Sequence, residues 1–159
     1  MFDPGMLALI GVGISVGLGA AGSALGSGAV AKVGASLLSK KPEEFSKILI
    51  LSALPSSQAL YGFLYGIIKP LQTGLLNGSL DAGVTEGIGF QFLVSALPVG
   101  IACLFSGMIQ GQVAASAVKI INDKPENLNQ GIVLAALIES FAIFGLIVSI
   151  LISFVGISF

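Results

Sequence analysis

The sequence contains no histidine, tryptophan or arginine, and it has a single cysteine, Cys103. Without histidine or a cysteine cluster, it offers no typical ligand set for zinc or another transition metal. One cysteine cannot form a disulfide within the chain, so Cys103 is interpreted as a small buried apolar residue. Only 9% of the residues are charged and the formal net charge is −1, so no basic surface for nucleic acid is predicted.

What remains is strongly apolar. Hydrophobic residues make up 55% of the chain, and the mean hydropathy is +1.01. A soluble globular domain does not have this composition. The sequence therefore predicts an integral, multi-pass membrane protein with little mass outside the bilayer. The N-terminus lacks the positive region of a signal peptide, so we expect the first apolar segment to be retained.

Four apolar segments are long enough to span a bilayer as helices. They cover about 5–38, 45–71, 87–118 and 130–154. The polar stretches between them, 39–44, 72–86 and 119–129, are predicted loops. Pro55 and Pro98 interrupt the second and third spans, where neighbouring helices must satisfy the backbone groups that a proline frees. The fold class is an all-α membrane protein of four transmembrane helices.

Small residues dominate the first span. Glycines recur there at a spacing of four, as in Gly13/Gly17 and Gly22/Gly26. This spacing places glycines on one helix face, so that the backbone of another helix can approach closely. We expect the first span to pack tightly against its neighbours.

The chain is internally duplicated. A shift of 83 residues (124 − 41) aligns the two halves without a gap. Identical residues at this offset are Lys41/Lys124, Pro42/Pro125, Glu43/Glu126, Ala53/Ala136, Leu54/Leu137, Ser57/Ser140, Ala59/Ala142, Gly62/Gly145, Ser23/Ser106, Gly28/Gly111, Val30/Val113 and Ala31/Ala114. The interpretation is two helical hairpins in parallel orientation, 1–78 and 79–159.

Lysines indicate how the hairpins cross the membrane. They gather after the first and third spans, at Lys40, Lys41, Lys47, Lys119 and Lys124. The middle loop instead carries Asp81 and Glu86, with only Lys69 near its start. Positive residues favour the cytoplasmic side, so we expect both hairpin turns there and both termini outside.

Glu139 is the only charged residue after Glu126, and it lies well inside the fourth span. A carboxylate at this depth costs several kcal/mol, about 3 by insertion-based scales, and marks a candidate functional site. A protonated carboxyl that merely hydrogen-bonds between helices is the alternative. In the first half of the repeat, Ser56 occupies the position equivalent to Glu139, so only the second half carries the carboxylate. Similarly, Ser27 occupies the position equivalent to Gln110.

Other polar side chains lie near mid-span in the second and third helices: Ser57, Gln58, Tyr61 and Gln110. If two hairpins pack side by side, they could converge on Glu139. The resulting oxygen-rich set suits a hard cation, and one carboxylate balances one monovalent charge, as for Na+ or H+. Individually, the glutamines could join helices, Ser57 could bond to its own helix, and Tyr61 could be a packed aromatic.

Three stretches together resemble one family. They are LPSSQALYGF at 54–63, FSGMIQG at 105–111 and IESFAIFG at 138–145. With the duplicated hairpin, they are similar to the rotor-ring proteolipid of V-type ATPases, especially the sodium-translocating bacterial enzymes. The resemblance covers essentially the whole chain. One departure is visible, since the family usually has threonine where this chain has Ser57.

The resemblance implies a homo-oligomeric ring of identical subunits in the bacterial plasma membrane. The first and third helices would line the inside of the ring, and the second and fourth would face outward. It also implies a stator subunit that supplies an arginine, a central-stalk subunit on the cytoplasmic side, and contact with membrane lipid. This chain would hydrolyse no ATP itself. The alternative to a rotor-ring subunit is a protein of a different functional class, a stand-alone pore or structural oligomer built from the same helices.

The resemblance also implies the ligands of the transported ion. Glu139 would carry the ion, and the others would be Gln110, Gln58, Ser57 and the backbone carbonyl of Leu54. Tyr61 would hydrogen-bond to Glu139 and close the site. The ion expected from this set is Na+, because a proton does not need two glutamines and a hydroxyl; H+ is the alternative. No organic cofactor is implied.

Overall fold

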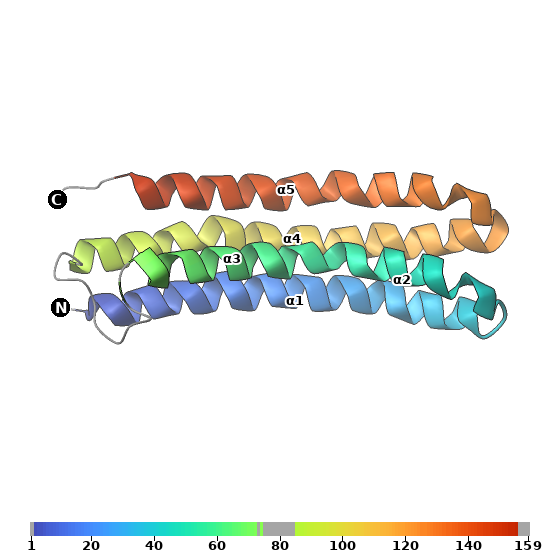
Figure 1. The fold of residues 1–159 in the computed structure, drawn as a ribbon, viewed down its shortest axis with the longest axis horizontal. Coiled ribbons are helices and arrows are strands. Elements are labelled where there is room, and N and C mark those ends of the chain that lie inside the picture. Colours follow the sequence, from blue (N-terminus) through green and yellow to red (C-terminus); the bar gives the residue numbers. More distant parts are fainter. Residues whose placement is uncertain (1, 73, 75–84, 156–159) are drawn as a thin grey trace.

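The computed structural model describes residues 2–72, 74 and 85–155, and these form a bundle of long helices (Figure 1). In the described residues, four helical segments are long and apolar enough to cross a membrane. The elements in order are α1 (Pro4–Leu38), the 3₁₀ turn η1 (Pro42–Glu44), α2 (Phe45–Ala53), the 3₁₀ turn η2 (Leu54–Ser56), α3 (Ser57–Gln72), α4 (Glu86–Asp123), the 3₁₀ turn η4 (Pro125–Asn127) and α5 (Leu128–Phe154).

The bundle is built from two hairpins. α1 and the broken helix α2–η2–α3 form the first, and α4 and α5 form the second. α1 and α4 pack against each other along their length, so each hairpin contributes its first helix to the shared interface. α1 begins and α5 ends at one end of the bundle, while both hairpin turns lie at the other (Figure 1). This is the arrangement that four antiparallel spans require.

Glycine permits the close approach of α1 and α4. A Cβ atom at Gly22 or Gly26 would overlap the backbone oxygens of Cys103 and Gly107, respectively. The Gly22/Gly26 spacing therefore packs as the sequence predicts. Gly13 and Gly17 differ, because a Cβ atom at either would meet nothing within 4 Å in the described chain.

Serine hydroxyls satisfy backbone amides near the two prolines. Val99, directly after Pro98, donates its amide to Ser149 Oγ of α5 at 2.9 Å. Ala59, four residues after Pro55, donates its amide to Ser23 Oγ of α1 at 2.8 Å. Both serines are buried. In each case a serine on another helix accepts a backbone amide close to the proline, so a neighbouring helix helps to pair backbone groups where a bilayer interior offers no water.

The 3₁₀ turn η2 breaks the second span at Pro55, one of the two prolines predicted to interrupt a span. One predicted boundary needs correction. The loop predicted over 119–129 was wrong: α4 continues through Asp123, and helical structure resumes at Pro125. α4 extends past the apolar span because Ile121 is fully buried in the core at the turn end of the bundle.

The middle of the chain is only partly described. Gln72 ends α3 and Glu86 begins α4, so the predicted loop of 72–86 was too long at both ends. Thr85 caps α4 by accepting the amide of Ile88. Most of the remaining loop, and the predicted boundary between 78 and 79, lie outside the described residues.

Candidate ion-binding site

Glu139 lies on α5 and meets the side chain of Tyr61 from α3. The Tyr61 hydroxyl donates a hydrogen bond to Glu139 Oε1 at 2.6 Å. Both side chains are partly buried. α5 is an uninterrupted helix here, so its backbone groups are paired within the helix and the carboxyl is the polar group that it offers.

Two glutamines meet in the interior beside this pair. Gln58 of α3 donates from Nε2 to Gln110 Oε1 of α4 at 2.6 Å. Both glutamines are fully buried, with 0% of their surface exposed. Burying two amides in a membrane bundle is costly unless each finds partners. This pair joins the two hairpins at the level where the first hairpin is broken.

The break η2 supplies the remaining predicted ligands. Ser57 donates its hydroxyl to the Leu54 carbonyl at 3.2 Å and lies 3.3 Å from Gln58 Oε1. Pro55 has no amide proton, and the 3₁₀ turn redirects the chain before α3 begins. Ser57 therefore does bond to its own helix, and in doing so it lies next to the glutamine pair.

The structure thus brings all six predicted residues into one region. They form two hydrogen-bonded groups: Tyr61 with Glu139, and Leu54, Ser57, Gln58 and Gln110 in a chain. Ser57 also interacts with the Tyr61 hydroxyl, which links the two groups.

One buried polar atom tests whether this donor set fits a cation. In the described part of the chain, Gln110 Nε2 is buried without a hydrogen-bond partner. An unpaired buried amide group costs about 1–3 kcal/mol, so such atoms call for an explanation. The set offers oxygens of a carboxylate, two amides, a hydroxyl and a backbone carbonyl. Those oxygens fit a hard monovalent cation as cargo. The unpaired Nε2 is a donor, so the Gln110 amide would have to present its oxygen to the ion.

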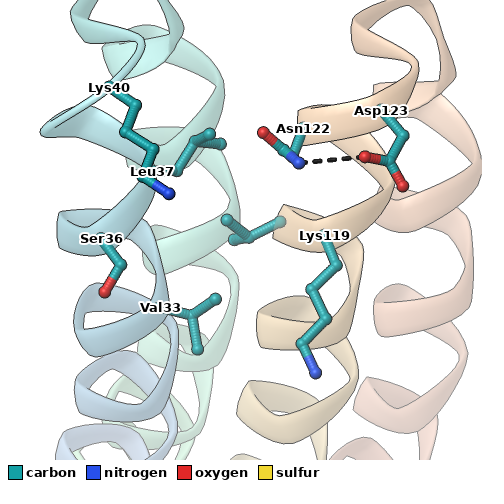
Figure 2. A pocket seen from close by; sticks show the side chains of 8 residues that line it. Val33, Ser36, Leu37, Lys40, Lys119, Asn122 and Asp123 are labelled. Atoms are coloured by element: carbon teal, nitrogen blue, oxygen red, sulfur yellow. Dashed lines mark hydrogen bonds between the residues drawn. The ribbon is translucent and has the colours of Figure 1, made fainter.

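A separate cavity of about 240 Å³ lies at the turn end, between α1 and α4. Lys40, Lys119 and Asp123 are among its lining residues (Figure 2). None of the six predicted residues lines this cavity. It is therefore distinct from the mid-span region.

In the sequence, Ser23 is distinguished only by its identity with Ser106 in the second repeat. In the structure, its hydroxyl accepts the amide of Ala59, the residue after Gln58. The local sequence of α1 does not identify the partner, which lies 36 residues away on another helix. A serine among glycines, facing a proline-broken span, is the signal that could have suggested it.

Two segments of the chain, 10–69 and 93–152, each match the family model for the C subunit of ATP synthase. Together they make up most of the sequence. The chain belongs to the ATP synthase C-subunit family. The two matches begin 83 residues apart (93 − 10), which is the offset of the internal repeat. The prediction of a duplicated helical hairpin is confirmed.

Two curated relatives extend this result. The V-type sodium ATPase subunit K of Enterococcus hirae is 39% identical over 130 residues, which cover 82% of this chain and 79% of that protein. The A-type ATP synthase subunit K of Methanocaldococcus jannaschii is 37% identical over 145 residues, covering 91% of this chain and 62% of that protein. The predicted resemblance to the rotor-ring proteolipid of V-type ATPases is confirmed.

Proposed function

We propose that this chain is the sodium-carrying subunit of a rotary ATPase ring, with Glu139 as the carboxylate that carries the ion. The observation that carries the proposal is the fully buried Gln58–Gln110 pair, bonded to Ser57, beside the Tyr61–Glu139 pair. Leu54 contributes its carbonyl. The name of the Enterococcus hirae relative, a sodium ATPase subunit, supports the same ion.

Charge explains how such a site would couple rotation to transport. With Na+ bound, Glu139 is neutral and can face lipid as the ring turns. Without the ion it is an anion, which the hydrocarbon interior disfavours by several kcal/mol, about 3 on insertion scales. The ion would therefore leave only where a stator subunit offers water and a countercharge. We assign that countercharge to a stator arginine, since this chain has none.

The assembly follows from the exposed faces. Gly13 and Gly17 of α1 have open space beside them, which leaves room for a neighbouring copy to pack closely in the ring.

The lysines indicate the orientation in the membrane. Lys40 and Lys119 lie at the turn end of the bundle, and positive residues favour the cytoplasm. We therefore place both hairpin turns, and the central stalk, on the cytoplasmic side, with both termini outside and membrane lipid around the ring.

Sodium and proton carriage are distinguished by transport through the complete ATPase. Membrane vesicles that contain the complex are supplied with ATP and radioactive sodium, with or without a protonophore. If the ring carries Na+, uptake continues when the protonophore collapses the proton gradient. Uptake that the protonophore abolishes would contradict the proposal and favour a proton ring. ATP-independent leakage of sodium would instead favour a stand-alone pore.

A further inference from the structure

The segment that carries Ser57 and Gln58 packs against α1, a helix that contributes none of the proposed ligands. Ser23 Oγ accepts the Ala59 amide at 2.8 Å. Gly19 lies one turn away on the same face, and a Cβ atom there would come within 2.8 Å of the Gln58 backbone oxygen. On the other side of Ser23, a Cβ atom at Gly26 would come within 2.7 Å of the Pro55 side chain. α1 therefore fits the broken turn closely over two helical turns.

The break creates the need for this support. In a continuous α-helix the Ala59 amide would donate to the carbonyl four residues earlier, that of Pro55. In the structure it donates to Ser23 instead, close to the 3₁₀ turn. In a membrane interior, water is not available to replace a missing partner, so this hydroxyl fixes where α3 begins.

The second repeat provides an internal comparison. Ser106 on α4 is the equivalent of Ser23, and Ala142 is the equivalent of Ala59. In the second hairpin Ile138 replaces Pro55, and α5 runs unbroken through this region. The Ala142 amide is paired within its own helix, and Ser106 Oγ is buried with no partner among the described residues. Of these two equivalent serines, Ser23 is hydrogen-bonded beside the broken span, and Ser106 has no partner beside the unbroken one.

We propose that Ser23 is a positioning residue for ion binding: its hydrogen bond to the Ala59 amide holds the backbone of the neighbouring Gln58 where the Gln58 side chain can reach the ion. The inference rests on the proposed sodium site. Ser23 touches no ion itself. Its effect passes through the backbone at 58–59 to the Gln58 side chain, which reaches Gln110.

The test compares Ser23→Ala with Ser106→Ala in the complete ATPase in membranes. Both variants remove one buried hydroxyl at repeat-equivalent positions. The measurement is the sodium concentration that half-protects Glu139 from carbodiimide at fixed pH and ionic strength. Ser23→Ala leaves a buried amide unpaired, so this concentration should rise about tenfold. Ser106→Ala removes an unpaired hydroxyl and should leave it unchanged.

Each of the following results would count against the proposal in a different way. Wild-type protection in Ser23→Ala would show that the hydrogen bond does not position Gln58. Equal weakening by both variants would show a general packing effect. Absence of sodium protection in the wild type would overturn the proposed sodium site itself, and with it the inference. If Ser23→Ala does not assemble, Ser23→Cys is used instead, because its slightly larger thiol is still a weak acceptor, and a smaller rise is expected. Unchanged protection in that variant would contradict the proposal.

Discussion

The two hairpins descend from one pattern but differ where the site is built. The first has Pro55 and a 3₁₀ turn in its second span, and the second has Ile138 in a continuous helix. At the next position the first carries Ser56 and the second carries Glu139. The broken span provides neutral oxygens, and the continuous span provides the charge.

If the proposed sodium site is right, this difference explains why a duplicated membrane protein would hold one ion rather than two. A single carboxylate balances a single monovalent charge. A broken helix exposes a carbonyl and re-aims the side chains that follow it. Neither hairpin has both features, so the proposed site exists only where α3, α4 and α5 meet. Single substitutions can remove the differences between the hairpins one at a time.

The largest effect should come from Glu139→Gln, which removes the carboxylate and leaves a similar volume. Sodium transport by the complete ATPase should fall to background, because no negative charge remains to hold the ion. The ring should still assemble, since glutamine can accept the Tyr61 hydrogen bond. Glu126→Gln, an exposed glutamate outside the apolar span, is the control and should transport normally. Transport that persists in Glu139→Gln would rule out this carboxylate as the carrier.

Gln110→Ala should come next. It removes an amide oxygen from the proposed cage and deprives Gln58 of its 2.6 Å partner. The sodium concentration that half-protects Glu139 should rise roughly 30-fold or more, since losing a ligand and leaving a buried amide unpaired each cost about 1–3 kcal/mol. Gln91→Ala is the control on the same helix, because Gln91 donates to the Ile152 carbonyl far from the site. Unchanged sodium dependence in Gln110→Ala would indicate that the glutamines join helices only.

The smallest of these effects should come from Pro55→Ala. The substitution restores a backbone amide and lets the second span approach the continuous geometry of α5. The Leu54 carbonyl and Ser57 hydroxyl would shift, and we expect the half-protecting sodium concentration to rise roughly fivefold, about 1 kcal/mol. Pro98→Ala in α4, where Ser149 satisfies the neighbouring amide, should leave it unchanged. Equal responses to the two substitutions would show that the break has no special role at the site.

Much of the fold could be predicted from the sequence because bilayer thickness fixes the length of apolar spans. Glu139 stood out for the same reason, as a charge in a long apolar run. The extension of α4 to Asp123 could not be predicted from hydropathy, since it depends on Ile121 packing into the core. The sequence also could not predict that the helix face of Gly13 and Gly17 is exposed, because glycine spacing does not indicate which partner packs against it.

The site was only partly predictable. Its polar residues could be found one by one, and the family resemblance grouped them. The role of α1 could not be found this way, because the Ser23–Ala59 contact depends on how the broken span lies against another helix. Packing of this kind is set by three-dimensional fit, and a local pattern does not record it.

The most direct test of the central claim is carbodiimide labelling of Glu139 in the wild-type ATPase, with and without NaCl, over a range of pH. Carbodiimides react with the protonated carboxyl, so an ion bound to the carboxylate blocks the reaction. If Glu139 binds Na+, sodium should slow labelling at every fixed pH and ionic strength, while an equal concentration of potassium should not. Labelling that follows pH alone, with sodium no better than potassium, would contradict sodium binding at Glu139.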